Sequence, residues 1–130
     1  MRLSMRTQYA LRALTLLAMN NDDAPVNTRE LATHESISVK FLEQVMLSLK
    51  NAGLVRSRRG RNGGYALTRP PADITLGELI RLMEGPESAM TDLADAPASN
   101  GLRDVMAEVD QATSYLLDRF TLEEICRRSR

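Results

Sequence analysis

The feature that most constrains this chain is a turn in which three glycines alternate with basic residues. Gly60, Gly63 and Gly64 permit positive φ angles and leave little side-chain bulk at the tip. Residues 54–58 and 65–68, on either side, read as short β-strands. The chain therefore predicts a β-hairpin here, and the hairpin is crowded with positive charge. Its arginines are Arg56, Arg58, Arg59 and Arg61.

Helices are expected before this hairpin. Apolar residues surround most of residues 7–20, which indicates a helix at the centre of a core. Asn27 can cap a short helix that stops near His34. After a tight turn, Ser38 can cap a longer helix, for which Gly53 supplies the stop. This order of elements is that of a winged helix-turn-helix: a helix, a short helix, a turn, a longer helix and a basic hairpin.

The composition changes after the hairpin. Residues 75–85 predict another helix, and residues 85–101 have the Ala, Ser, Pro and acidic composition of a linker. A long helix over about 102–119 carries one apolar stripe, and a final helix starts at Thr121. We therefore expect a mainly α fold with a small β-hairpin.

The charges are divided between two halves of the chain. Residues 1–69 hold 11 Lys/Arg and 5 Asp/Glu, a net of +6, whereas residues 70–130 hold 6 and 12, a net of −6. A basic half is typical of a part that binds a polyanion. In a winged helix-turn-helix, the start of the longer helix meets base edges in the major groove. The hairpin arginines meet phosphates or a narrow minor groove.

The residue inventory excludes several other classes of protein. Cys126 is the only cysteine and His34 the only histidine, so one chain has no internal disulfide and no multi-thiolate or His-rich metal site. No apolar run reaches the roughly 18 residues of a membrane span, and the start is a poor signal peptide. We expect a cytoplasmic protein without a membrane partner. No nucleophile–base pair, P-loop or metal set indicates an enzyme.

Several motifs of the chain are specific in order and spacing. The most specific is Arg59-Gly60-Arg61-Asn62-Gly63-Gly64-Tyr65. The others are Tyr9-Ala10-Leu11-Arg12-Ala13-Leu14, Phe41-Leu42-Glu43-Gln44, Asn51-Ala52-Gly53-Leu54-Val55, Ile74-Thr75-Leu76-Gly77-Glu78-Leu79-Ile80 and Glu84-Gly85-Pro86. With these motifs, the stretch from Ser4 to Gly85 resembles the Rrf-two family of bacterial transcription regulators, the IscR, NsrR and CymR type.

The resemblance implies a homodimeric regulator, usually a repressor, that binds an inverted-repeat operator in double-stranded DNA. It implies a winged helix-turn-helix domain at 1–84, a linker at 85–101, and a dimerisation helix and C-terminal helix at 102–130. It assigns DNA contacts to the start of the first helix, to the recognition helix and to the wing, and a twofold interface to the long helix. These residues are Ser4, Thr7, Ser38, Lys40, Glu43, Gln44, Arg59, Arg61, Asn62 and Gly63 for DNA, and Val105, Val109 and Leu116 for dimerisation.

One departure from the family concerns its cofactor. Many members hold an iron–sulfur cluster through three cysteines between the Glu84-Gly85-Pro86 end and the dimer helix. Residues 87–101 of this chain contain neither cysteine nor histidine. We therefore expect no cofactor and a protein closer in type to the cluster-free, CymR-like branch.

The input signal stays open. Cys126 could be a redox switch, because Arg127 and Arg128 would favour its thiolate, or a small buried residue beside Ile125. A small molecule or a protein co-effector acting on the acidic linker is a further alternative. The alternative function is a winged-helix module that binds proteins and has no specific DNA binding.

Overall fold

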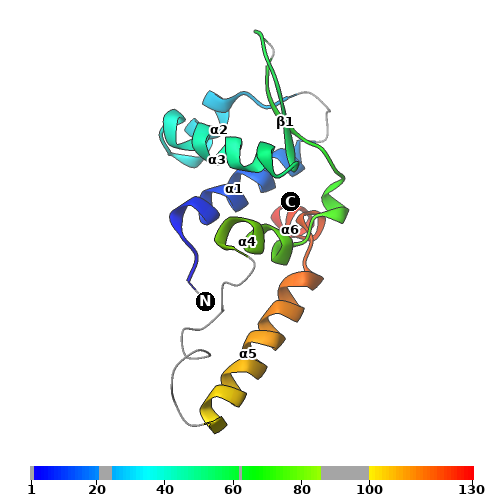
Figure 1. The fold of residues 1–130 in the computed structure, drawn as a ribbon. Helices are drawn as coiled ribbons and strands as arrows, with labels where there is room; N and C mark the ends of the chain where they lie inside the picture. The colour runs from blue at the N-terminus through cyan, green and yellow to red at the C-terminus, as the bar shows by residue number, and fades with distance from the viewer. Residues whose placement is uncertain (1, 21–24, 62, 86–99) are drawn as a thin grey trace.

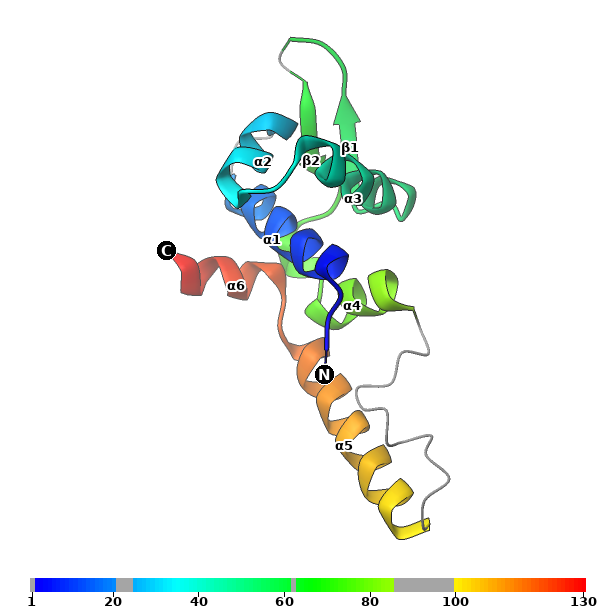
Figure 2. The ribbon, with the colours of Figure 1, turned by 90° about the vertical axis from the view of Figure 1, so that its left-hand side faces the viewer.

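The computed structural model describes residues 2–20, 25–61, 63–85 and 100–130. A body of packed helices carries a β-hairpin on one side and a long projecting helix on the other (Figure 1). A second view shows the same arrangement (Figure 2). The elements are α1 (Met5–Met19), α2 (Thr28–Glu35), α3 (Val39–Asn51), β1 (Val55–Arg58), β2 (Gly64–Leu67), the short helix η1 (Pro71–Asp73), α4 (Leu76–Glu84), α5 (Asn100–Arg119) and α6 (Leu122–Ser129).

Helix α1 runs through the centre of the body, as its apolar circumference predicts. It packs against α2, α3, α4 and α6. It begins at Met5 rather than at Thr7, because the Ser4 hydroxyl accepts the Thr7 backbone N–H at 3.2 Å and caps the helix. The core around it is aliphatic. Its largest buried side chains include Leu14, Leu31, Leu42, Met46, Leu49, Leu54, Ile74, Leu79 and Leu122.

The helix-turn-helix pair is formed by α2 and α3. Asn27 and Ser38 each cap the helix that follows by accepting a backbone N–H, which confirms both expected caps. Ser36 lies in the turn with a φ of 57°, and it is the one non-glycine residue with positive φ in the described chain. Gly53 follows α3 with a φ of 81°, as its expected role as the stop requires.

The wing is the hairpin of residues 55–67, in which β1 and β2 pair antiparallel. Val26 adds a bridge to β2, with hydrogen bonds of 2.8 and 2.9 Å between its backbone and that of Tyr65. Gly64 has a φ of 150°, and a Cβ atom there would overlap the Val26 carbonyl oxygen. A glycine is therefore required where the wing joins the body.

Helix α5 is attached to the body at its C-terminal end. Leu117 is buried against Ile80, Leu3 and Leu76, and Arg81 forms an ion pair with Asp118 at 2.5 Å. The rest of α5 extends away from the body (Figures 1 and 2). No helix in the described residues is long and apolar enough to cross a membrane.

Helix α6 returns to the N-terminal core, where Leu122 and Cys126 are buried beside α1. Residues 102–130, expected to hold a dimerisation helix and a C-terminal helix, thus comprise a helix α5 that projects and a helix α6 that packs in the core. Leu122 at the start of α6 donates its N–H to the Ile74 carbonyl at 3.0 Å. Of the expected linker, residues 86–99 lie outside the described residues.

Candidate nucleic-acid interface

Helix α3 separates a buried face from an exposed polar face. Its buried residues recur at helical spacing and belong to the core. Lys40, Glu43 and Gln44 are exposed near its N-terminus, next to the exposed cap residue Ser38. The structure therefore leaves all four expected base-reading side chains accessible on one end of α3.

The wing carries its arginines away from the core. In the register of the hairpin, Arg56 lies opposite Ala66 and Arg58 opposite Gly64, so both arginines share the face that turns away from Tyr65. All four wing arginines, at 56, 58, 59 and 61, are exposed. Within the described part of the chain, none of these four forms an ion pair or a hydrogen bond through its side chain.

Other arginines of the chain differ in this respect. Five of them, outside the wing, have carboxylate partners, and the distances lie between 2.5 and 3.0 Å. The wing therefore concentrates cations that the protein itself does not neutralise. The five arginines that have carboxylate partners are Arg12, Arg69, Arg81, Arg127 and Arg128.

The wing follows α3 in the chain and contacts this helix. Helix α3 contacts β1, and the two lie side by side in Figures 1 and 2. Burial raises the pKa of the Tyr65 phenol, and the negative charge of Glu43 raises it further. Glu43 on α3 is thus within electrostatic range of Tyr65 on β2.

The start of α1 holds the remaining two residues expected to contact DNA. Ser4 is exposed, as a contact with a sugar–phosphate backbone requires. Thr7 is fully buried at 0% exposure, and its hydroxyl lies 3.1 Å from the Ser4 hydroxyl. The expectation that the Thr7 side chain contacts DNA is therefore wrong, because capping turns it into the body.

Arg6 is a residue that the sequence analysis missed. Its guanidinium donates to the Ser48 hydroxyl on α3, so a cation from α1 lies against the recognition helix. The only sequence signal for it is a basic side chain in the first turn of a mostly apolar helix.

The tip of the wing is tightly closed. Gly63 donates its N–H to the Gly60 carbonyl at 3.0 Å. A Cβ atom at Gly63 would overlap the Arg58 carbonyl oxygen, so Gly63 lets the two strands approach each other. Asn62, also expected in the wing surface, lies outside the described residues.

The cysteine is placed as a core residue. Cys126 is 3% exposed, and its thiol lies 3.8 Å from the Thr15 carbonyl oxygen. Burial raises the pKa of the Cys126 thiol, although the charge of Arg130 opposes this rise. Arg127 and Arg128, expected to activate the thiol, pair instead with Glu124 at 3.0 Å. This geometry favours the packing alternative.

The Rrf2 family model, described as an iron-dependent transcriptional regulator, matches residues 3–128. The chain belongs to the Rrf2 family. CymR of Bacillus subtilis (strain 168) is 35% identical over 96% of this chain and 89% of the relative. NsrR of Bacillus licheniformis is 35% identical over 96% of this chain and 92% of the relative. These Rrf2-related proteins are HTH-type transcriptional regulators, and this chain is a DNA-binding regulator of the same family.

Solved structures give the same result. The structure of CymR (YrzC) of B. subtilis matches with a TM-score of 0.87 and 34% identity, covering 98% of both chains. The IscR structure of T. potens matches with a TM-score of 0.83 and 30% identity, covering 100% of this chain and 89% of the other. The expected winged-helix architecture is confirmed.

The iron in the Rrf2 description does not fit the residues of this chain. The one thiol, Cys126, is buried and lies against a backbone carbonyl, and the one imidazole, His34, is exposed on α2. The described ranges contain no group of three or more His, Cys, Asp or Glu side chains placed to hold a metal ion. A cluster held by three thiolates of one Rrf2 chain therefore has no ligand set here.

Proposed function

We propose that this chain is a homodimeric, sequence-specific repressor that binds an inverted-repeat operator and uses no iron–sulfur cluster. The observation that carries the proposal is the set of four exposed wing arginines without a side-chain partner in the described residues, together with the exposed polar side chains of α3, which contacts β1. A protein-binding surface does not need several uncompensated cations, whereas each one can neutralise a DNA phosphate.

The α3 side chains supply direct readout in this proposal. Lys40 and Gln44 can donate to acceptors on base edges, and Ser38 can either donate or accept. Glu43 can accept from a cytosine amino group but repels phosphates where that partner is missing. Glu43 therefore acts as a filter for sequence more than as a source of affinity.

The wing and the start of α1 supply contacts to the DNA backbone. Arg59 and Arg61 provide the charge at the wing tip, and the neighbouring Asn62 and Gly63 complete the wing contact. Ser4, together with Arg6 beside α3, approaches the phosphates from the other end of α3. Such contacts orient the protein on the duplex without reading its sequence.

The dimer is formed by α5. Its apolar stripe, defined here as Leu102, Val105, Val109, Ala112 and Leu116, recurs at the three- and four-residue spacing of a helix–helix seam. Val105 is 54% exposed and Leu116 is 50% exposed in the single chain. Burying this stripe against its twofold mate removes the exposed apolar surface and places two winged domains on two half-sites.

Fluorescence anisotropy with labelled duplex DNA tests this function. The probe is the DNA immediately upstream of this protein's own gene, compared with the same bases scrambled, at two salt concentrations. We expect tighter binding to the upstream DNA and a steep loss of affinity as salt increases. Equal, weak binding to both duplexes would oppose the proposal and favour a protein-interaction module.

A further inference from the structure

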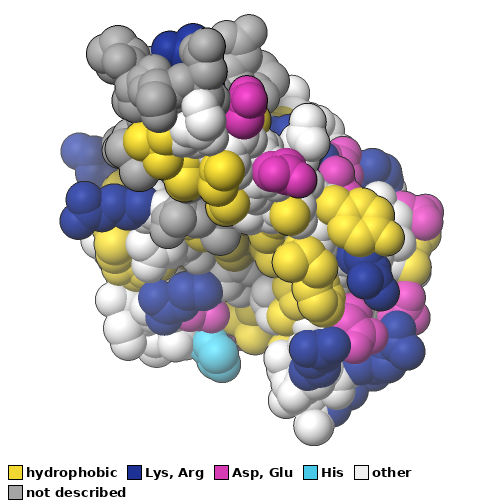
Figure 3. Space-filling view, turned by 90° about the horizontal axis from the view of Figure 1, so that it is seen from below, with side chains coloured by type: hydrophobic (Ala, Val, Ile, Leu, Met, Phe, Trp, Pro, Cys, Tyr) yellow, Lys and Arg dark blue, Asp and Glu magenta, His cyan; other side chains and the backbone are white. Residues whose placement is uncertain are grey.

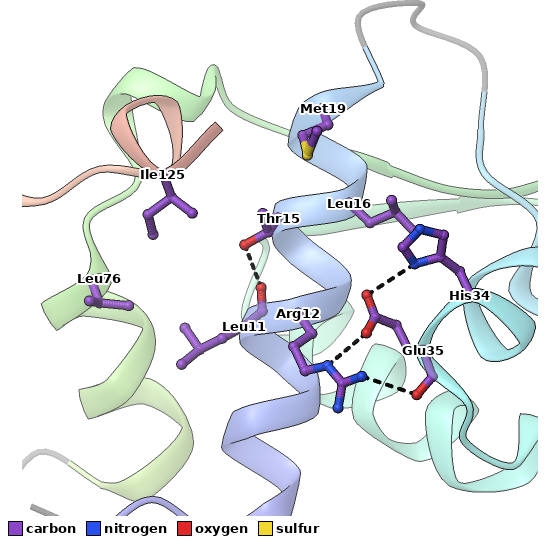
Figure 4. Close-up of a pocket in the computed structure, with 9 residues that line it drawn as sticks. All are labelled: Leu11, Arg12, Thr15, Leu16, Met19, His34, Glu35, Leu76 and Ile125. Atoms are coloured by element: carbon purple, nitrogen blue, oxygen red, sulfur yellow. Dashed lines mark hydrogen bonds and ion pairs between the residues drawn. The ribbon is translucent and has the colours of Figure 1, made fainter. Parts of the chain in front are cut away.

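A hollow of about 450 Å³ lies on the surface over α1, away from α3 and the wing. Its two sides are the end of α2 and the pair of α4 and α6 (Figure 4). Seen from below, the molecule shows hydrophobic patches among charged side chains and a hollowed surface between two lobes (Figure 3). The apolar residues that line the hollow are Leu11, Leu16, Met19, Leu76 and Ile125.

The hollow has one polar edge. Arg12 donates from Nε to Glu35 Oε2 at 2.6 Å and from Nη2 to the Glu35 carbonyl oxygen at 3.2 Å. His34 Nδ1 lies 3.4 Å from Glu35 Oε1. Figure 4 shows these three side chains turned toward one another at the α2 side of the hollow.

At this edge, Arg12 has N–H donors without a partner in the described residues, whereas the Glu35 carboxylate is already engaged. Both Glu35 carboxylate oxygens face a partner, and the Glu35 side chain is only 12% exposed. Arg12 is 50% exposed, and its guanidinium has more N–H groups than these contacts use. Thr15 donates its hydroxyl to the Leu11 carbonyl at 2.8 Å, so its proton is engaged within α1. A molecule that enters the hollow therefore meets aliphatic walls and a rim where Arg12 has unused N–H donors.

We propose that this hollow binds a small apolar molecule with a single anionic head group such as a carboxylate. The apolar body covers the aliphatic walls, and the head group accepts hydrogen bonds from the Arg12 N–H groups that do not face Glu35. The volume falls within the range of about 300–1,000 Å³ that is usual for small-molecule sites. The mainly apolar lining with a few convergent polar groups is also typical of such sites.

Occupancy of the site acts on the helix-turn-helix, and this step rests on the proposed function. Glu35 is the last residue of α2, and Ser36, with its φ of 57°, immediately precedes the approach to α3. An anion on Arg12 competes with Glu35 for the guanidinium and weakens the link between α1 and this turn. The ligand thereby changes how α3 is held and lowers the affinity for DNA.

The binding test uses 8-anilinonaphthalene-1-sulfonate, an aromatic fluorophore with one anionic group, and the full chain. We expect a saturable increase in its fluorescence at one site per chain. Decanoate should displace the fluorophore at about tenfold lower concentration than decanol, because only the carboxylate forms charge-assisted bonds with Arg12. Equal displacement by the acid and the alcohol would overturn the anionic specificity. No fluorescence increase, as when a second copy covers the hollow, would overturn the site.

Two variants locate the site. Thr15→Phe fills the hollow and should abolish the saturable signal, whereas Arg12→Gln should remove the preference for decanoate over decanol. Arg127→Gln is the matched control, since Arg127 is an exposed, ion-paired arginine outside the lining, and should behave as the unchanged chain. Unfolding temperatures check that each variant is folded. Retained fluorophore binding in a folded Thr15→Phe would place the site elsewhere and contradict the proposal.

The coupling to DNA is measured separately by anisotropy. Decanoate, below its micelle-forming concentration, should weaken DNA binding of the unchanged chain and leave that of Arg12→Gln unaffected. Unaltered DNA binding of the unchanged chain at saturating decanoate would overturn the coupling. If the chain fails to bind DNA at all, the proposed function fails, and the fluorophore experiment still decides whether the ligand site exists.

Discussion

The Glu84 carboxylate accepts a hydrogen bond from the Ser4 backbone N–H at 2.7 Å, so the last residue of α4 holds the beginning of α1. The Ser4 backbone bond lowers the pKa of Glu84 most, and a hydrogen bond from the Thr7 hydroxyl lowers it further. Because Ser4 is a proposed DNA contact, this carboxylate positions one edge of the DNA surface.

Replacing Glu84 should therefore remove a contribution to stability that depends on pH. The pKa of Glu84 is lowered in the folded chain, so its contribution is present at neutral pH and is lost as pH falls through that lowered pKa. Glu84→Gln should reduce the free energy of unfolding at neutral pH by at most about 1 kcal/mol, since water screens this carboxylate. Urea unfolding from neutral to acidic pH measures the difference, which should shrink on acidification. A pH-independent difference, or an equal effect of Glu108→Gln on α5, would argue against this role.

Removing a wing arginine should weaken all DNA binding. Arg59→Ala deletes a cation that no side chain of the described residues neutralises, so affinity should fall alike for operator and scrambled DNA. The slope of log affinity against log salt should decrease by about one. Anisotropy at several salt concentrations gives both quantities. Arg127→Ala, which removes an arginine already paired with Glu124, should leave the slope unchanged. A slope that changes equally in both variants would contradict the role of the wing.

Removing the α3 carboxylate should change preference more than affinity. Glu43→Ala deletes an acceptor for cytosine and also a charge that repels phosphates. Discrimination at one base pair of the operator should fall by about 1–3 kcal/mol, while binding to scrambled DNA is kept or improved. Competition among operators substituted at single positions measures this loss. A full base preference in the variant would show that Glu43 reads no base.

Placing a charge in the α5 stripe should dissociate the dimer. Val105→Asp puts a carboxylate at the centre of the proposed twofold interface, where it would be buried without a partner. Ala107→Asp adds the same charge to the opposite side of α5 and serves as the control. Sedimentation velocity should show monomers for Val105→Asp and dimers for the unchanged chain and for Ala107→Asp. Dimers in all three would place the interface elsewhere.

The Cys126 thiol should react slowly in the folded chain. It is buried, and its pKa is raised by that burial, so little thiolate is accessible. Modification by a disulfide reagent should be slow in buffer and fast in guanidinium chloride. DNA binding should be the same after mild oxidation. A rapid reaction of the folded chain would restore the redox alternative.

Much of the fold follows from local sequence signals. Asn27 and Ser38 are good caps wherever they precede an apolar helical repeat, and both cap helices here. The glycines of the wing predict a tight turn because few other residues adopt its backbone angles, and Gly60 and Gly64 have φ values of 109° and 150°. The exposed polar end of α3 follows from the spacing of its apolar residues.

The features that the sequence did not reveal depend on tertiary contacts. Thr7 is buried because Ser4 and Glu84 meet it from two segments far apart in the chain. Arg6 belongs to the proposed DNA surface only because α1 crosses beside Ser48. The arginines after Cys126 looked like activators of the thiol, but the helical spacing pairs them with Glu124 instead. Two charged residues that are close in the sequence need not contact each other, because the fold decides which neighbour each side chain faces.

The most direct test of the central claim is a selection of DNA by the unchanged chain from a pool of random-sequence duplexes, read by sequencing. We expect enrichment of one inverted repeat, with half-site centres about 10 base pairs or a multiple of that apart. This result follows from two copies of α3 and the wing, related by the α5 twofold, that enter major grooves on one face of the duplex. A pool that shows no enriched sequence would contradict specific DNA recognition. Enrichment of a single unrepeated site would contradict the dimer.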